Sequence, residues 1–221
     1  MRFDILSLFP ESFESYFNVS ILKRAAEDGR IEIALHQLRD FTHDKHHTVD
    51  DTPYGGGAGM LLKVEPLAEA ITHLKTLAPE KKTRTILFSA KGKRYTQADT
   101  RRLAEYDRLI LVCGRYEGVD ERIAEHFVDE ELSVGDFVLT GGELPAMIVV
   151  DSVARLTPGV LGNADSSLAE SHSEEGSVEY PQYTKPEEFQ GHTVPEVLLS
   201  GHHGEIAKWR AEESKKRSQK S

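Results

Sequence analysis

The chain has 221 residues, 38% of them hydrophobic and 29% charged, which suits one large soluble domain or one domain with a small appendage. Its apolar runs fall short of the roughly 20 residues that span a bilayer, and its single cysteine excludes an internal disulfide framework. The net charge of −10 argues against an overall basic face for nucleic acid, although local basic clusters such as the tail 208–221 remain compatible with phosphate contacts.

Strands and helices are expected to alternate along the first part of the chain. The N-terminus, MRFDILSLFPES, lacks the apolar segment and cleavage site of a signal peptide, which favours a cytoplasmic protein without membrane contact. We expect a strand at 2–8, a helix from Pro10 to Gly29 and a strand at 31–38. Residues 39–60 have no clear period and are predicted to form a loop.

The same alternation continues to residue 156. We expect further helices at residues 66–77, from Thr96 onward and at 142–156, with Asp99 as the capping partner of Thr96. Further strands are expected at residues 85–89 and 109–113. This order predicts an α/β domain with a largely parallel sheet covered on both faces. The pattern breaks after Pro158, so we expect a first domain at 1–161, a linker at 162–177 and a short, mainly helical C-terminal domain at 178–221.

Two motifs in the loop 39–60 admit more than one interpretation. DTPYGGGAGM (51–60) lacks the Lys-Ser/Thr of a phosphate-binding loop, and no strand leads directly into it, so it is either a backbone that approaches a partner closely or a flexible surface loop. HDKHH (43–47) suggests a metal site, and with it a metal hydrolase, only weakly because its spacing is loose. A solvent-exposed or RNA-facing loop is favoured there, and we expect no bound structural metal.

Three glycine-containing segments are expected to follow strands, at residues 88–92, 112–122 and 132–145. Ligands of open α/β sheets bind outside the carboxyl ends of the strands, so these segments predict one ligand-binding crevice. Asp151 and Arg155 lie four residues apart on the last helix of the domain, where an intrahelical ion pair is the simpler interpretation and an arginine aimed into the crevice is the alternative.

Long stretches of the chain resemble the bacterial tRNA (guanine-37-N1)-methyltransferase (TrmD) family, which belongs to the SPOUT methyltransferases. The stretches occur in the family's order and extend the resemblance from Met1 to about Arg210. They are RDFTHDKHHTVDDTPYGGGAGM (39–60), LVCGRYEGVDER (111–122), SVGDFVLTGGELPAMIVVDSVARLTPGVLG (133–162) and YPQYTKPEEFQGHTVPEVLLSGHHGEIAKWR (180–210).

The resemblance implies an α/β domain with a trefoil-knotted parallel sheet, which binds S-adenosylmethionine in the knot loops. It also implies a cytoplasmic tRNA-modifying enzyme that is a homodimer, with tRNA bound at the interface by the linker and C-terminal domain, and it leaves an assisting Mg²⁺ open. The residues it assigns to the cofactor are Phe88, Ser89, Gly114, Tyr116, Glu117, Gly118, Ser133, Val134, Gly135, Asp136, Phe137, Val138, Leu139, Gly141, Gly142 and Pro145. It assigns Asp51, Gly59 and Ser171 to RNA binding.

Chemistry at guanine N1 needs a base, because this nitrogen carries a proton at neutral pH. Glu170 stands where the family has its catalytic aspartate, and Arg155 matches the arginine that would stabilise negative charge on guanine O6. The extra methylene of Glu170 leaves an alternative, an RNA-binding relative with impaired catalysis, and Asp165 is a conceivable substitute base.

Overall fold

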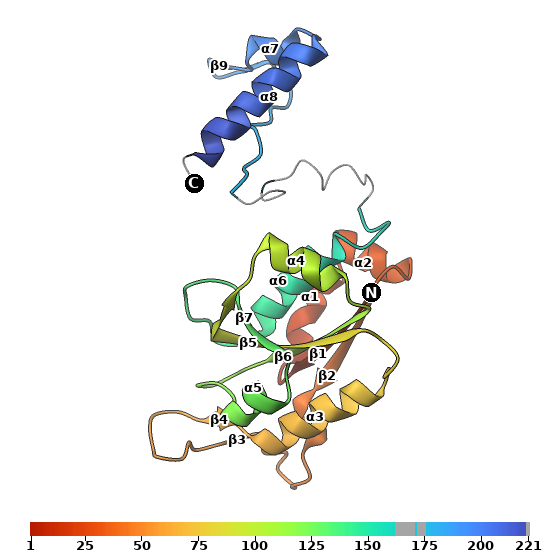
Figure 1. Cartoon of the computed structure of the whole chain (residues 1–221), viewed down its shortest axis with the longest axis vertical. Coiled ribbons are helices and arrows are strands. Elements are labelled where there is room, and N and C mark those ends of the chain that lie inside the picture. The colour runs from red at the N-terminus through yellow and green to blue at the C-terminus, as the bar shows by residue number, and fades with distance from the viewer. Residues whose placement is uncertain (162–170, 172–175, 220–221) are drawn as a thin grey trace. The chain divides into compact units, whose positions relative to one another are not determined.

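The computed structural model describes residues 1–161, 171 and 176–219, and the chain forms two compact units, Met1–Gly162 and Asn163–Ser221. The first unit is built on a five-stranded, wholly parallel sheet in the order β2-β1-β6-β5-β7 (Figure 1). These strands are β1 (Arg2–Ser7), β2 (Glu32–Gln37), β5 (Thr83–Arg94), β6 (Arg108–Cys113) and β7 (Glu130–Ser133).

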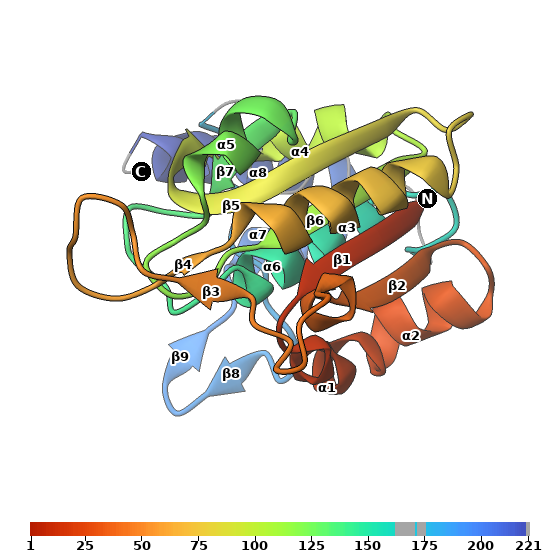
Figure 2. The same cartoon turned by 90° about the horizontal axis from the view of Figure 1, so that it is seen from below.

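Helices cover both faces of this sheet (Figures 1 and 2). One face packs against η1 (Pro10–Phe13), α1 (Glu14–Phe17), α2 (Ser20–Glu27), α4 (Gln97–Ala104) and α6 (Glu143–Ala154). The other packs against η2 (Leu38–Phe41), α3 (Val64–Thr76) and α5 (Glu121–His126). β1 shows why two faces are needed, because Phe3 and Ile5 enter the first core while Leu6 enters the second.

The expected α/β class and parallel sheet are confirmed, whereas two expected elements differ in detail. The helix predicted from Pro10 to Gly29 is broken, because Val19 is extended and Ser20 has φ +53°. Residues 85–89 belong to a longer strand, β5, which pairs with Leu132 of β7 at both Phe88 and Lys93. The segment 88–92 is therefore a bulge within a strand and not a loop after one.

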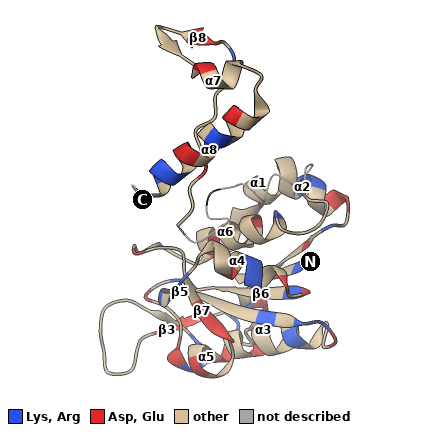
Figure 3. Cartoon of the chain, turned by 45° about the horizontal axis from the view of Figure 1, so that its top comes forward, with Lys and Arg blue, Asp and Glu red and all other residues tan. Residues whose placement is uncertain are grey.

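Among the described residues of the second unit, the regular structure is mostly helical. A two-residue ribbon pairs β8 (Glu188–Phe189) with β9 (His192–Thr193), and two helices follow, α7 (Glu196–Leu199) and α8 (His203–Ser218). The ring of Trp209 lies 6.5 Å from that of Tyr183, and the Arg210 guanidinium lies over Tyr180 at 4.8 Å. Basic and acidic residues both occur along α8 (Figure 3).

No helix in the part of the chain that the structure describes combines the length and apolar character needed to cross a membrane.

A pocket at the carboxyl ends of the parallel strands

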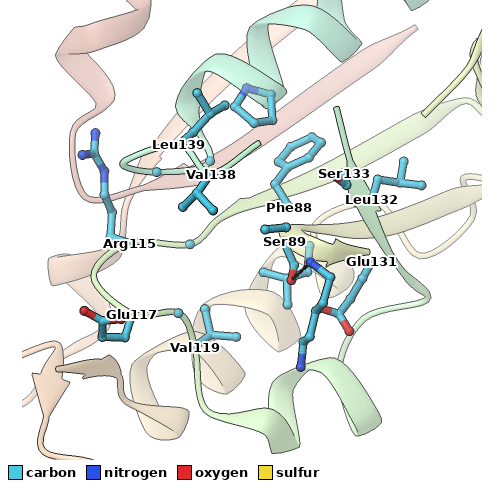
Figure 4. Close-up of a pocket in the computed structure, with 18 of the residues that line it drawn as sticks. Phe88, Ser89, Arg115, Glu117, Val119, Glu131, Leu132, Ser133, Val138 and Leu139 are labelled. Carbon is cyan, nitrogen blue, oxygen red and sulfur yellow. Dashed lines mark hydrogen bonds between the residues drawn. The ribbon is translucent and has the colours of Figure 1, made fainter. Parts of the chain in front are cut away.

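A pocket of about 500 Å³ opens at the bulge of β5 and the carboxyl ends of β6 and β7 (Figure 4). All three segments predicted to share a crevice contribute to it, which agrees with the rule for open α/β sheets. The lining residues among those assigned from the resemblance are Phe88, Ser89, Gly114, Tyr116, Glu117, Gly118, Ser133, Val134, Phe137, Val138, Leu139, Gly141, Gly142 and Pro145. Gly135 and Asp136 are not among the lining residues.

Gly135 and Asp136, in the loop after β7, have other neighbours than the pocket. The ring of Phe137 lies so close to Gly135 that an added Cβ would be 2.3 Å from Phe137 Cε1. Asp136 instead faces solvent, where its carboxylate lies 3.3 Å from the guanidinium of Arg94. Only the neighbouring residues of this loop therefore face the pocket.

The segments after β6 and β7 are held together by backbone contacts. Gly142 N donates to Gly114 O at 2.9 Å, and Arg115 forms an isolated bridge with Gly141. An added Cβ on Gly142 would lie 2.6 Å from Cys113 Cα, so only glycine permits this approach. The start of α6 is thereby fixed against the end of β6.

The pocket is apolar on one side and acidic on another. Figure 4 shows Phe88, Val138 and Leu139 in its upper part, Glu117 at the lower left and Glu131 at the right. Glu121 also lines the pocket, where its carboxylate accepts a hydrogen bond from Lys91 Nζ. The described lining thus holds three carboxylates but only two cations, Lys91 and Arg115. This excess of negative charge favours a ligand with positive charge.

Several further residues line the pocket although they were not assigned individually from the sequence, and seven of them lie within the three segments predicted to share a crevice. They are Leu61, Leu87, Ala90, Lys91, Arg115, Val119, Glu121, Ala124, Glu131, Leu132 and Thr140. Glu121 and Ala124 lie on α5 and Glu131 on β7, two elements that the sequence pattern did not predict. Lys91 and Arg115 could have been predicted to line the pocket, because each is a charged residue directly beside a glycine, Gly92 or Gly114.

The glycine-rich stretch 52–60 joins β3 (Asp50–Asp51) to β4 (Leu61–Leu62), and we call it the arm. Its base is tied to the pocket, because Glu117 N donates to Met60 O at 3.0 Å and Leu62 N donates to Gly118 O at 3.0 Å. Gly59 has φ +82°, and an added Cβ there would lie 2.4 Å from Glu117 Cγ. Gly59 and Asp51, both assigned to RNA binding, thus lie at the arm's two ends.

The predicted catalytic pair is described only in part. Arg155 caps the C-terminal end of α6, and its backbone N–H donates to Asp151 O at 3.1 Å. The Asp151 carboxylate accepts a hydrogen bond from the hydroxyl of Tyr16, which raises the Tyr16 pKa, and the sequence pattern did not predict this partner. Glu170 and Asp165 lie outside the described residues, whereas Ser171 Oγ accepts a hydrogen bond from Glu179 N at 2.9 Å.

Two histidines of the stretch 43–47 form side-chain hydrogen bonds with neighbouring residues. His43 Nε2 lies 2.7 Å from Glu69, and His47 Nδ1 lies 3.0 Å from Thr42 Oγ1. Among the residues that the structure describes, no group of three or more His, Cys, Asp or Glu side chains is arranged to hold a metal ion.

The parallel sheet and the pocket at its carboxyl edge define an α/β protein with a small-molecule-sized site. The model of the family described as "tRNA (Guanine-1)-methyltransferase TrmD" matches residues 1–221. The chain belongs to this family.

Relatives named "tRNA (guanine-N(1)-)-methyltransferase" are similar over nearly the whole chain. The protein of Dehalococcoides mccartyi (strain 195) is 54% identical over 220 residues, which cover 100% of this chain and 88% of the relative. That of Geotalea uraniireducens is 56% identical over 97% of this chain and 85% of the relative. That of Chloroflexus aurantiacus is 57% identical over 99% of this chain and 85% of the relative.

Proposed function

We propose that the protein transfers a methyl group from S-adenosylmethionine to N1 of guanine 37 in tRNA. The observation that carries this proposal is the pocket, in which 14 of the 16 residues assigned to the cofactor from the family resemblance lie together. The alternative of a non-catalytic RNA-binding relative gains no support from the comparisons, since the similar proteins carry the names of methyltransferases. Because tRNA is the proposed substrate, the cytoplasm remains the expected compartment.

The residues around the pocket fit S-adenosylmethionine in size and charge. A volume of about 500 Å³ lies within the roughly 300–1,000 Å³ typical of cofactor sites. Glu117, Glu121 and Glu131 suit its positive groups, while Phe88 and Leu139 offer apolar surface to its adenine ring. Gly114 and Gly142 leave the nearby backbone close to the cavity. When bound, the cofactor supplies a methyl group activated by a sulfonium.

The protein's own groups have two tasks in this reaction. Glu170 would accept the proton from guanine N1, which exposes the nitrogen lone pair that attacks the methyl carbon. Negative charge then moves toward guanine O6, where the guanidinium of Arg155 would stabilise it most in the transition state. The pocket would hold the methyl donor in line with N1, so placement would contribute to the rate beside the two side chains.

A homodimer is the proposed assembly, with the second copy on the exposed side of α6. Leu144 and Ile148 on this helix are 57% and 46% exposed, although most of α6 is buried. Val138, in the loop that leads to α6, is also exposed. These apolar side chains would be buried by a second copy, and Ser171 with the C-terminal unit would then contact tRNA across the interface.

The test is nucleotide-resolved methylation of an unmodified tRNA transcript with guanine at positions 36 and 37. Wild-type protein is expected to methylate N1 of guanine 37, and Glu170→Ala is expected to lower the rate by about 100-fold or more. Arg155→Ala is expected to lower kcat by about 100- to 1,000-fold with unchanged cofactor affinity. A chelator added to a parallel reaction tests whether Mg²⁺ assists.

Glu170→Asp separates the two explanations of the unusual carboxylate. A large gain in rate would identify Glu170 as an impaired base, whereas an unchanged and substantial rate would mean that Glu170 is either competent or irrelevant, two cases that Glu170→Ala separates. Absence of methyl transfer by wild-type protein that still binds S-adenosylmethionine would contradict the proposed activity.

A further inference from the structure

Tyr54 at the start of the glycine-rich arm is the most exposed of the large hydrophobic side chains that the structure describes. Its relative exposure is 103%, so the ring has as much free surface as in an extended peptide. A tyrosine buries a large apolar area when it finds a partner, and leaving the whole ring in water forgoes that gain. This exposure leaves the whole ring available to a partner from outside the chain.

The arm that carries this ring is fixed at its base, beside the pocket, and its tip is clear of other residues. The base is bonded to the pocket-lining residues Glu117 and Gly118. At the tip, Gly55 and Gly56 have φ +84° and +78°, and an added Cβ on either would meet nothing within 4 Å. Left-handed glycines with open space around them let a flat partner approach the ring and the backbone together.

The neighbours of Tyr54 argue for a small flat partner over a protein surface. Its neighbours in the chain are all small, namely Pro53, Gly55, Gly56, Gly57 and Ala58. An exposed apolar patch that serves protein association covers several hundred Å², which one ring among glycines does not supply. A single nucleobase has an area comparable with the ring and stacks on it through its π-face.

The charges nearby argue against a phosphate contact. Asp51 lies at one end of the arm and Glu117 beside the other. Arg122, the nearby cation on α5, is already held by Asp120 through bonds of 2.8 and 2.7 Å. Carboxylates repel the phosphate backbone but leave the neutral face of a base unaffected, and they accept hydrogen bonds from its N–H edge.

We propose that Tyr54 is the stacking residue for one unpaired base of the tRNA beside the pocket. This inference rests on the proposed function, because it names how the same site would hold its RNA. Stacking is tolerant of base identity, so Tyr54 would contribute affinity and placement, while recognition of guanine stays with the groups around the reacting base.

The experiment measures RNA affinity directly, in the full-length protein with S-adenosylhomocysteine bound. A tRNA transcript is titrated into wild type, Tyr54→Ser, Tyr54→Phe and the control Leu77→Ser, which removes an exposed apolar side chain at the end of α3. Tyr54→Ser is expected to weaken RNA binding by roughly 5- to 150-fold, the range for loss of one base stack. Tyr54→Phe keeps the ring and is expected to bind within about threefold of wild type, as is Leu77→Ser.

Two further readouts distinguish a base stack from other roles. The dependence of RNA affinity on salt is expected to keep its slope in Tyr54→Ser, because no phosphate contact is lost. The affinity for S-adenosylhomocysteine, measured by calorimetry without RNA, is expected to stay unchanged. Wild-type RNA affinity in Tyr54→Ser, a reduced salt slope, or a loss confined to S-adenosylhomocysteine binding would each overturn the proposal. RNA binding is measured without turnover, so failure of methyl transfer remains a separate result.

Discussion

The guanidinium Nε of Arg115 lies 3.0 Å from the carboxylate of Glu143, and this pair joins two of the segments that form the pocket. The contact is an ion pair without a well-aligned hydrogen bond between the two atoms. Glu143 also accepts a hydrogen bond from Ser7 Oγ at 2.7 Å, and the Arg115 guanidinium lies over the ring of Phe9 at 4.7 Å. One buried carboxylate thus connects the end of β1, the segment after β6 and the start of α6.

Glu143→Ala is expected to lower the free energy of unfolding by about 3 kcal/mol, because it leaves a largely buried guanidinium without its partner. We also expect S-adenosylhomocysteine to bind about tenfold or more weakly, since the two pocket segments lose a common anchor. Urea unfolding and calorimetric titration measure the two effects. Glu143→Gln can still accept from Ser7 and should be intermediate, and unaltered ligand affinity in Glu143→Ala would contradict the anchoring role.

A second buried ion pair stabilises the opposite part of the sheet. Asp4 and Arg108 are both fully buried on neighbouring strands, with Arg108 Nε 2.6 Å from Asp4 Oδ2. Burial alone raises the pKa of Asp4, but hydrogen bonds from His36, Arg2 and Arg108 outweigh it and hold the pKa well below its ordinary value. Asp4 is therefore charged in the folded protein at every pH near neutrality.

Stability should accordingly fall in acid. Because the folded-state pKa of Asp4 is depressed, its contribution is fully present above the unfolded pKa of about 3.9 and is lost as the pH falls toward the folded value. Urea midpoints of wild type between pH 5 and pH 2 should decline more steeply than those of Asp4→Asn. At pH 7 we expect Asp4→Asn to be less stable by about 3–5 kcal/mol. Parallel pH profiles for the two proteins would show that Asp4 does not carry this dependence.

A substitution at the N-terminus of α4 is expected to lower stability without changing the pocket. Thr96 and Asp99 form a capping box, in which each side chain bonds the backbone N–H of the other. Thr96→Ala is expected to lower the free energy of unfolding by about 1 kcal/mol. Neither residue lines the pocket, so the affinity for S-adenosylhomocysteine should not change. A loss of affinity would imply that α4 is coupled to the site.

This capping box was predictable from the sequence because its partners lie three residues apart. The α/β class and β6 were predictable for the same kind of reason, since periodicity and apolar runs are local signals. The Arg115–Glu143 pair was not, because its partners are far apart in the sequence and meet only after β6 and α6 have packed. Likewise β7 was not predictable, because it has only four residues and is defined by its pairing with β5 on both sides of the bulge.

The candidate site followed the same division between local and non-local signals. Glycine-bearing segments after apolar runs predicted where a pocket would open, and the family resemblance supplied individual residues. Which residues of the loop 133–142 line the pocket depends on packing, and the sequence could not report that Gly135 and Asp136 do not line it. The trefoil knot remains a prediction, since it depends on chain threading, which no local pattern reports.

Gly142 provides the most direct test of how the pocket is built. An added Cβ would meet backbone atoms, 2.6 Å from Cys113 Cα and 3.0 Å from Gly114 N, and backbone cannot move aside as a flexible side chain can. Gly142→Ala is therefore expected to push the start of α6 away from β6, to lower the free energy of unfolding by about 1–3 kcal/mol, and to weaken S-adenosylhomocysteine binding by at least about tenfold.

Gly204 on α8 is the matched control for this substitution. It has no left-handed φ, and an added Cβ there would meet nothing within 4 Å. Gly204→Ala should raise the free energy of unfolding by up to about 1 kcal/mol, because alanine restricts the unfolded chain, and it should leave ligand affinity unchanged. Equal affinities in Gly142→Ala and Gly204→Ala would show that the pocket tolerates separation of α6 from β6, and the close approach at Gly142 would then serve packing alone.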